Sequence, residues 1–438
     1  MSDRGVTGHG VGDHGVGYHG VGDHGGIDPA VGNRTVSTSG AGDRQRLALV
    51  AARRRARRSW VRYGAGMGVV LAVMAVFVFS VWRTSEIRSV HSHPTTKAAK
   101  ALAAGAIPSS LRPLWHTTDR MALGQPVYLD VVATYSTHTV AGRDATTGAV
   151  RWGYTRTDRS ICSVVSDGSV VMAIYRHDGN CDELSALDAD TGRRAWTRTQ
   201  FDNGTPTVQP IPQFVLEVTP GALDLIQPSG NPPYGGGATY WYYPQVNDCT
   251  TISGVVGTTG VLWGSRCGSS STLTFRIGSG DKNKANAWSV PLDGRTPLAA
   301  DNQIMALSAD RRTILVLSAA SGKITSSIPL PFAVAAPTVP FATPSISGSV
   351  ELIMVPGQVI AVAANATSVL WHRATTGRVT DTSVGLLCAS AGRVSVVRSG
   401  TGATARTITV PGLPADATVA VRGAGLVSST KAGTTAWG

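Results

Sequence analysis

Two stretches of the chain share one pattern: GRDATTGAVRW at residues 142–152 and ALDADTGRRAW at residues 186–196. In both, an Asp is followed by Thr-Gly three and four positions later and by Trp four positions after the Gly. Thr-Gly supplies a tight turn in which Gly takes a positive φ, and the Asp side chain hydrogen-bonds the turn backbone. The residues that match are Asp144, Thr147, Gly148 and Trp152 in the first stretch and Asp188, Thr191, Gly192 and Trp196 in the second.

Weaker copies of this unit continue along the chain at intervals of 31 to 47 residues. A period of about 40–45 residues that holds four short strands is typical of one β-propeller blade. We therefore predict an all-β fold, a β-propeller of seven or eight four-stranded blades over residues 112–438, in which an upstream strand at Trp115 completes the last blade. Each Trp is expected in an outermost strand, filling the wedge between blades. The further tryptophans in this register are Trp241, Trp288, Trp371 and Trp437, and the positions at Ser326 and Arg406 lack Trp.

The unit resembles the pyrroloquinoline-quinone-type (quinoprotein-type) β-propeller repeat, whose pattern is A-x-D-x-x-T-G-x-x-x-W. Residues 186–196 match it fully, and residues 142–152 match it with Gly142 in place of Ala. The resemblance implies a seven- or eight-bladed propeller, here in a bacterial single-pass membrane form. Quinone-dependent relatives hold the cofactor and Ca²⁺ with acidic ligands and an adjacent Cys-Cys pair, which this sequence lacks.

The composition agrees with a fold of many short strands and turns. Charged residues make up 15% of the 438 residues, against about 25% on average, and there are 51 glycines, which disfavours a helical bundle. The net charge of +12 is concentrated near the N-terminus, with 10 − 5 = +5 in residues 1–62 and 4 − 1 = +3 in residues 83–100. Because the rest of the chain has no basic patch interleaved with aromatics, we expect no nucleic-acid partner.

Residues 63–82 contain no charged side chain and read YGAGMGVVLAVMAVFVFSVW. Twenty helical residues span about 30 Å, the thickness of the hydrocarbon core, so we predict a transmembrane signal anchor in the lipid bilayer. Arginines are denser before this segment than after it, which predicts a cytoplasmic N-terminus and an extracytoplasmic C-terminal domain in the cell membrane. A cleaved signal peptide is the alternative, but the run is long for one and no small-x-small site follows it.

The regions on either side of this segment have low-complexity sequences. Residues 1–62 form a Gly/His-rich and Arg-rich tail with a repeated GVGDH pentad, which places His9, His14, His19 and His24 five residues apart. Such apolar-poor sequence predicts a disordered cytoplasmic tail, with chelation of Zn, Ni or Cu as the alternative. Residues 83–111 are rich in Ala, Ser, Thr and Lys and are predicted to be an extracytoplasmic stalk.

All five cysteines lie in the predicted outer domain, as suits an oxidising compartment. Cys162 and Cys181 are 19 residues apart, and Cys249 and Cys267 are 18 apart, in each case within one blade. We predict the disulfides Cys162–Cys181 and Cys249–Cys267, with Cys388 left as a buried thiol. A metal site is the alternative, although no C-x-x-C spacing or histidine cluster supports it.

No catalytic constellation is recognisable in the predicted propeller. Motifs such as G-x-S-x-G, H-E-x-x-H and the P-loop are missing from the sequence. The carboxylates are scattered singly along the chain, so we expect no catalytic, cofactor-binding or metal-binding residues and no cofactor. The carboxylates considered are Asp130, Asp167, Glu183, Glu217 and Glu351.

These observations favour a non-catalytic, membrane-tethered scaffold or accessory subunit that binds envelope proteins. A resemblance to the envelope-assembly propeller of Gram-negative bacteria indicates the same role. The alternatives are a signal-transducing sensor or a ligand-binding propeller and, less favoured, a quinoprotein dehydrogenase. The candidate contact loops are residues 206–212, 228–237 and 329–344; the aromatic run at residues 240–243 either adds a contact edge or packs both faces of its sheet.

Overall fold

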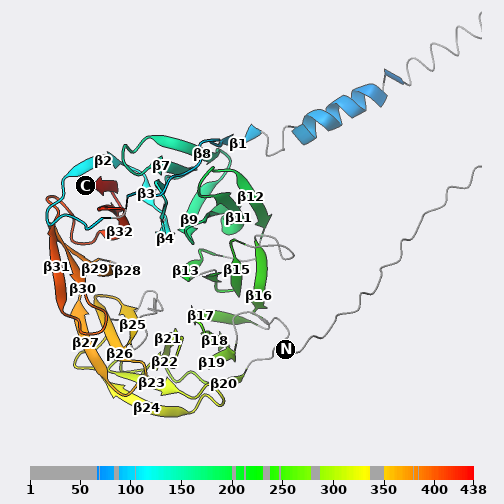
Figure 1. Ribbon diagram of the computed structural model, residues 1–438. Coiled ribbons are helices and arrows are strands. Elements are labelled where there is room, and N and C mark those ends of the chain that lie inside the picture. The colour runs from blue at the N-terminus through cyan, green and yellow to red at the C-terminus, as the bar shows by residue number, and fades with distance from the viewer. Residues whose placement is uncertain are drawn as a thin grey trace, which may run out of the picture. The chain divides into compact units, whose positions relative to one another are not determined.

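In a computed structural model of the chain, the described residues are 67–68, 70–82, 88–103, 105–199, 204–211, 214–229, 237–245, 248–277, 287–335, 350–377, 379–382 and 384–438. The chain divides into two compact units, Met1–Phe79 and Ser80–Gly438. The larger unit is a β-propeller in which eight sheets follow one another around a ring (Figure 1). The predicted all-β propeller is therefore confirmed, and eight is the correct blade count.

Consecutive strands of each blade pair with one another, from a first strand near the centre of the ring to a fourth at its rim (Figure 1). Blade 1 contains β3 (Arg120–Met121), β6 (Val131–Tyr135), β7 (Thr139–Asp144) and β8 (Val150–Arg156), with β5 (Val127–Tyr128) paired to β6. Blade 2 contains β9 (Ser160–Ser166), β10 (Val170–His177), β11 (Asn180–Asp188) and β12 (Arg194–Thr199), with β4 (Leu123–Gly124) parallel to β9. Blade 3 contains β13 (Thr207–Ile211), β14 (Phe214–Val218), β15 (Ala222–Gln227) and β16 (Ala238–Pro244). Blade 4 contains β17 (Cys249–Val256), β18 (Gly260–Cys267), β19 (Ser270–Ile277) and β20 (Trp288–Pro291).

The second half of the ring repeats this order. Blade 5 contains β21 (Thr296–Ala300), β22 (Ile304–Leu307), β23 (Thr313–Leu317) and β24 (Ile324–Pro329). Blade 6 contains three described strands, β25 (Val350–Val355), β26 (Gln358–Ala363) and β27 (Val369–Ala374). Blade 7 contains β28 (Thr380–Thr382), β29 (Gly385–Ser390), β30 (Arg393–Val397) and β31 (Thr404–Thr409). Blade 8 contains β32 (Thr418–Arg422), β33 (Gly425–Thr430), β34 (Gly433–Trp437) and β2 (Pro113–Thr117).

The ring is closed by two segments from opposite parts of the sequence. β2 pairs antiparallel with β34, and the backbones of Arg112 and Gly438 exchange hydrogen bonds of 3.0 and 3.1 Å. The strand at Trp115 thus completes the last blade, as predicted. Trp437 corrects another expectation: it lies in β34, the third strand, and its indole donates to Ser428 Oγ (2.8 Å). The register at Trp437 is therefore not a further outer strand, which explains the short last interval of 31 residues.

The outer-strand Trp of one blade packs on the turn of the next blade. The ring of Trp152 in blade 1 lies over Gly192 in blade 2, and its Nε1 donates to Ala189 O (3.0 Å). Gly192 has φ +70°, and a Cβ there would lie 2.6 Å from the indole ring, so no other residue fits without displacement. The same arrangement joins Trp115 to Gly148, Trp196 to Gly237, Trp288 to Gly322 and Trp371 to Gly402.

The Asp shared by residues 142–152 and 186–196 builds this turn. Asp144 Oδ1 accepts hydrogen bonds from the backbone N–H of Thr146 (2.9 Å) and Thr147 (2.8 Å) and from Thr147 Oγ1 (3.0 Å). Asp188 accepts the equivalent bonds from Thr191 N and Oγ1, both 2.8 Å. The repeat residues therefore shape and support the seams between blades, and they are distributed around the ring.

Two seams lack the tryptophan and are filled in other ways. Blade 5 has Ser326 in the outer strand, and the turn of blade 6 has Thr367 in the Gly position, so both partners are missing together. Leu330 and Val334 are buried there in one apolar cluster with residues of both blades. Blade 7 has Arg406 in its outer strand.

Residues 88–103 and 105–112, which we call the strap, contact several blades of the propeller. β1 (Val90–His93) pairs antiparallel with β8 and adds a fifth strand outside blade 1. Farther along, Thr95 N donates to Thr191 O (2.9 Å) in blade 2, and Lys100 N donates to Asp130 Oδ1 (2.9 Å) in blade 1. The strap ends in the cluster between blades 7 and 8, where its apolar side chains Ile107 and Leu111 are buried.

The predicted tail at residues 1–62, with its histidine pentad, lies outside the described residues, as do residues 63–66 and 69 of the predicted membrane segment. Residues 67–68 and 70–82 are helical. Within the described parts of the chain no helix combines the length and apolarity needed to cross a membrane, so the predicted transmembrane helix is not supported.

Substituting the seam glycine tests the packing of Trp on the next blade. Gly192→Ala places a Cβ against the Trp152 ring and forces Ala into positive φ, so we expect a loss of about 2–5 kcal/mol. Gly179→Ala is the matched control, because Gly179 in the same blade has φ +89° but open space around the new Cβ, and about 1–2 kcal/mol is expected. Denaturant unfolding of both variants measures the difference; equal losses would contradict the seam model.

Candidate functional site

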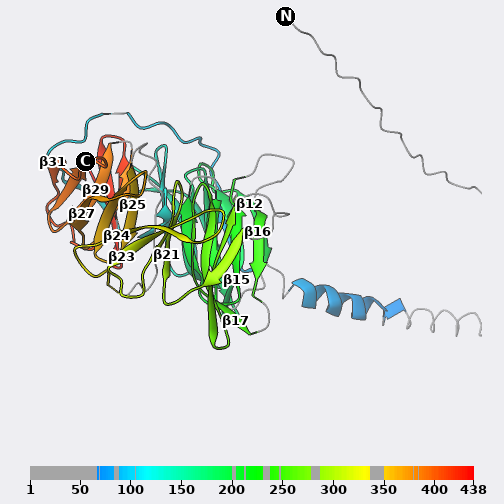
Figure 2. The ribbon, with the colours of Figure 1, turned by 90° about the horizontal axis from the view of Figure 1, so that it is seen from below.

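The propeller has two chemically different ends. Because strands alternate in direction within a blade, the turns between first and second strands and between third and fourth strands lie at one end. We call this the repeat-turn end; it contains the turns 144–148 and 188–192. The turns between second and third strands lie at the other end, which we call the disulfide end; it contains the turns 178–179 and 268–269. Figure 2 shows the ring edge-on, with the strands running between these ends.

Both predicted disulfides are present, at the end that carries the second-to-third-strand turns. Cys162 in β9 is bonded to Cys181 in β11, and Cys249 in β17 is bonded to Cys267 in β18. Cys388 is a buried free thiol, as predicted, and burial raises its pKa. The metal-site alternative finds no support among the described residues, which contain no group of three or more His, Cys, Asp or Glu placed to hold an ion.

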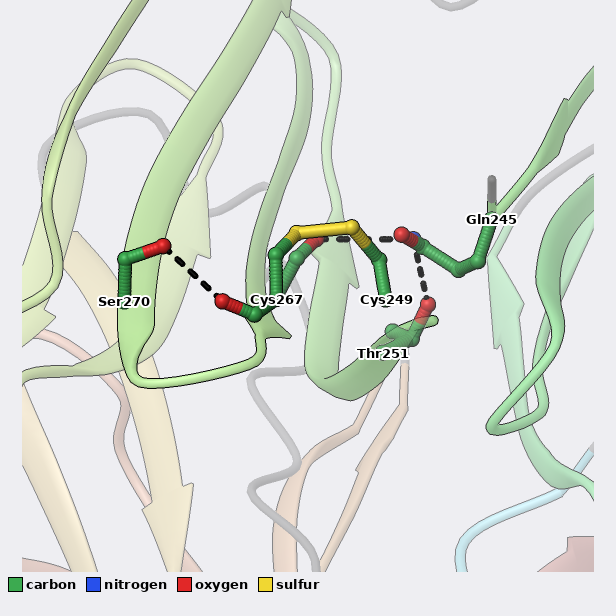
Figure 3. Close-up of a disulfide and its surroundings, with 6 residues drawn as sticks. Gln245, Cys249, Thr251, Cys267 and Ser270 are labelled. Atoms are coloured by element: carbon green, nitrogen blue, oxygen red, sulfur yellow. Dashed lines mark hydrogen bonds between the residues drawn. A yellow bond between two sulfur atoms is a disulfide. The ribbon is translucent and has the colours of Figure 1, made fainter. Parts of the chain in front are cut away.

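Blade 4 has a hollow of about 530 Å³, whose lining begins at Ser269, two residues after Cys267. Hydroxyl side chains dominate its lining, with a single carboxylate. Figure 3 shows that Gln245 bridges the two strands next to the disulfide: its Nε2 donates to Thr251 Oγ1 (2.8 Å) and to Ser265 Oγ (3.4 Å). The lining residues are Ser269, Ser270, Ser271, Thr272, Ser289, Val290, Pro291, Asp293 and Gly294.

A buried ion-pair network lies between blades 1 and 2. Arg156 is fully buried; its guanidinium forms two 3.0 Å bonds to Asp158 and also pairs with Glu183. Glu183 accepts a second ion pair from Arg159. The hydrogen bonds from Arg156 hold the pKa of Asp158 well below its usual range. Because every charge has an opposite partner, the network fixes a seam and leaves no free acid or base for catalysis.

A pair of buried carboxyl groups lies at the repeat-turn end of blades 5 and 6. Asp301 follows β21 and accepts a hydrogen bond from Thr258 N (2.7 Å), while Glu351 in β25 is 2% exposed. Neither carboxyl oxygen of Glu351 has a hydrogen-bond partner. Burial and, secondly, the nearby Asp301 raise the pKa of Glu351 to about 8, and the smaller, opposing effect of the Gln303 backbone N–H does not cancel this rise. Glu351 is therefore a mostly neutral acid at pH 7.

The other carboxylates that the sequence analysis describes as scattered have specific partners. Asp130 pairs with Arg151, and Asp167 accepts a hydrogen bond from Ser229 Oγ (2.9 Å) in the next blade. These contacts join different strands or blades, so linear sequence could not show them. They do not converge on one centre with Glu351.

The aromatic run in β16 packs within its blade and the next. Trp241 is buried, with its ring centroid 5.8 Å from Tyr243 and 5.4 Å from Trp263 in blade 4. The Arg276 guanidinium lies 5.0 Å from the Trp241 centroid. Trp241 and Tyr243 thus pack on one face of the sheet, whereas Tyr242, which alternates to the other face, is 42% exposed, so the aromatic run packs one face and not both.

The three predicted contact loops do not gather at one end. Residues 207–211 form the first strand of blade 3, β13, and run from the disulfide end to the repeat-turn end. Residues 330–335 follow β24 at the disulfide end, whereas residues 228–229 and 237 belong to a turn at the repeat-turn end. Most of the remaining residues of these loops lie outside the described chain.

The cysteines of this chain do not fit the quinone site of the enzymes that share its repeat. Those enzymes use an adjacent Cys-Cys pair over the cofactor. Here the two disulfides join residues 19 and 18 positions apart, and the remaining Cys388 is buried alone.

The chain is an eight-bladed β-propeller, and the Asp, Thr-Gly and Trp residues at several of its seams resemble those of PQQ-like repeats. Residues 105–219 match the family model described as outer membrane protein assembly factor BamB. BamB from Moraxella catarrhalis is similar in structure, with 18% identity, a TM-score of 0.47, and coverage of 75% of this chain and 99% of that one. The computationally designed protein Ika8 has 15% identity, a TM-score of 0.49 and the same coverage. A sequence search of curated proteins finds no match.

The raised pKa of Glu351 predicts a pH-dependent stability. The folded chain keeps a proton on Glu351 that the unfolded chain, with an ordinary pKa of 4.5, releases. The contribution of this protonated carboxyl group to the free energy of unfolding is complete below about pH 4.5 and is lost as the pH rises through about 8. Glu351→Gln removes this pH dependence, because Gln does not titrate. The difference in thermal midpoint, variant minus wild type, should therefore be larger at about pH 8.5 than at about pH 5.5.

The control for this measurement is Asp310→Asn, at an exposed carboxylate whose pKa is lowered by the hydrogen bond from Ser308. Because Asp310 is ionised throughout that range, its variant should show no such rise. A flat difference for Glu351→Gln would show that the carboxyl group is not held neutral.

Proposed function

We propose that this chain is a non-catalytic scaffold of the cell envelope, an accessory subunit that binds other proteins through its propeller. The observation that carries the proposal is the match of residues 105–219 to the family model named for an outer membrane assembly factor. Two disulfides agree with an oxidising compartment outside the cytoplasm. The buried Arg156 is paired with Asp158 and Glu183, and the buried Glu351 is mostly neutral, so these groups serve structure.

We further propose that the propeller is tethered to the membrane through residues 63–82, with the N-terminus in the cytoplasm. The support is the run of twenty uncharged residues and the excess of arginine before it. The apolar side chains of helical residues 70–82 are exposed, with Val76 at 69%, as expected for a segment that contacts lipid.

A topology assay tests the tether. The reporter is an enzyme that works only outside the cytoplasm, fused after Gly438, and we expect it to show activity. We also expect the protein to stay with the membranes during alkaline carbonate washing. Activity of a cytoplasm-specific reporter at the same position would refute both the orientation and the oxidising location of the cysteines.

The disulfide end is the better candidate for partner binding. The strap already lies on the repeat-turn end, where it contacts Thr191 in blade 2 and Asp130 in blade 1. The disulfide end carries the hollow of blade 4, and among the described residues no tryptophan seam contact lies there, so its turns are free to differ from blade to blade.

Photo-crosslinking in intact cells tests which end binds. A photoreactive residue at exposed Ser269, at the disulfide end, should give a discrete crosslinked product with an envelope protein. Ala320, exposed in a turn at the opposite end, is the matched control and should give none. A product from Ala320 alone would reverse the assignment of the end, and no product from either position would refute the scaffold.

A further inference from the structure

The two disulfides differ in what they join. Cys162–Cys181 links β9 and β11, which lie on opposite sides of β10 and do not pair with each other, and its Cα atoms are 6.2 Å apart. Cys249 and Cys267 are direct register partners on the paired strands β17 and β18, with Cα atoms 4.0 Å apart. Disulfide Cα distances are usually about 4.4–6.8 Å. Strand pairing therefore sets the Cys249–Cys267 separation, and the hairpin does not need the bond to keep these residues together.

The two bonds also differ in their surroundings. Cys181 is fully buried in the apolar cluster of blades 2 and 3, and Cys162, which is itself only half-buried, packs against that cluster. Cys249 and Cys267 are both partly exposed, and Arg266 and Gly268 beside Cys267 are exposed. Thiol–disulfide exchange requires a thiolate to reach a sulfur atom, so access favours the blade 4 bond. The two closed loops are nearly equal in length, 18 and 19 residues, so chain entropy does not distinguish them.

We propose that Cys249–Cys267 is a thiol–disulfide exchange site whose co-reactant is a solvent-exposed dithiol, whereas Cys162–Cys181 is a permanent structural bond. One thiolate of the dithiol attacks a sulfur of the pair, forms a mixed disulfide and displaces the other cysteine as a thiolate. The second thiol of the dithiol then attacks the mixed disulfide. Overall, two electrons and two protons pass from the dithiol, which becomes a disulfide, to Cys249 and Cys267, which become thiols.

Reduction changes only the end of blade 4. Gln245 bridges Thr251 and Ser265 next to the disulfide, so the strands stay paired inside this point when the bond opens (Figure 3). Beyond it lies the turn 268–269, and Ser269 belongs to the wall of the hollow. Ser270 Oγ still donates to Cys267 O (3.0 Å), which links the cysteine backbone to that wall. The redox state of the pair therefore controls the mobility of one side of the hollow.

Native-state reduction followed by alkylation and peptide mass mapping tests the proposal. The full chain is exposed to increasing dithiothreitol without denaturant, and thiols are trapped at intervals. Cys249 and Cys267 should become alkylated at least about tenfold faster than Cys162 and Cys181, and an added disulfide oxidant should restore the bond. Equal rates, faster reduction of Cys162–Cys181, or reduction of Cys249–Cys267 only where the whole chain unfolds would each overturn it.

Hydrogen exchange of the reduced and oxidised chains locates the effect. Exchange should increase on reduction at residues 249–250 and 266–272 and stay unchanged in blade 2. A spread through the whole of blade 4, or no change at the hollow, would refute the local opening.

Paired variants separate the exchange site from the structural bond. The double variant Cys249→Ser/Cys267→Ser should have a thermal midpoint close to that of the native chain in which only Cys249–Cys267 has been reduced. Cys162→Ser/Cys181→Ser should lower the midpoint more, because it leaves polar groups in a buried cluster. The reverse order would contradict the division of roles.

Discussion

The contact between an indole ring and a glycine of the next blade is the interaction on which the ring depends. It combines an indole N–H to carbonyl hydrogen bond of about 3 Å with burial of a large apolar ring against a residue that has no Cβ. Each such contact joins only neighbouring blades, so the stability of the ring is approximately a sum of blade and seam contributions. Five described seams use it, and each requires both partners, since Trp without Gly clashes and Gly without Trp leaves a gap.

The seams without this contact show how the ring is completed. Between blades 5 and 6 the Trp and the Gly are lost together, and the apolar chain after β24 fills the space. Blade 8 has no continuous turn between its third and fourth strands, because β34 and β2 come from opposite parts of the sequence. Blade 7 accordingly carries Arg406 instead of Trp, and Ile107 and Leu111 of the strap join the apolar cluster of this seam. The strap thus replaces a seam contact that local sequence cannot supply.

The parts of this architecture that could be predicted from sequence are those encoded within one blade. The turn residues Asp188 and Gly192, the seam Trp196 and both disulfide pairs lie within a few tens of residues of their partners. The register at Trp437 misled because the third and fourth strands of a blade look alike when the turn between them is interrupted. β1 was not expected, since three of its four side chains are exposed and its pairing rests on backbone hydrogen bonds that leave no sequence pattern.

Contacts between blades could not be predicted from the sequence for a different reason. Asp301 and Glu351 are separated by 50 residues and meet because the ring places blades 5 and 6 side by side. Arg156 and Glu183 likewise belong to different blades, and the partner of each is set by the angle between the sheets. The sequence does not reveal the angle between the sheets. It shows only an acidic residue beside a turn, which is an ordinary surface feature.

The contact between an indole ring and a glycine of the next blade also explains why the turns at one end of the propeller can vary in sequence more than those at the other. At the repeat-turn end, each turn between third and fourth strands that carries a seam Gly must accept a tryptophan, so its residues are restricted by the neighbouring blade. At the disulfide end no indole packs on a turn that the structure describes, and Gly179 and Gly268 have open space where a Cβ would be. These turns can change their residues at little cost in stability, but they need another source of order, which the Cys162–Cys181 and Cys249–Cys267 bonds supply. A binding surface at the disulfide end therefore costs the least stability. A reducible disulfide at that end also provides a means of changing the surface.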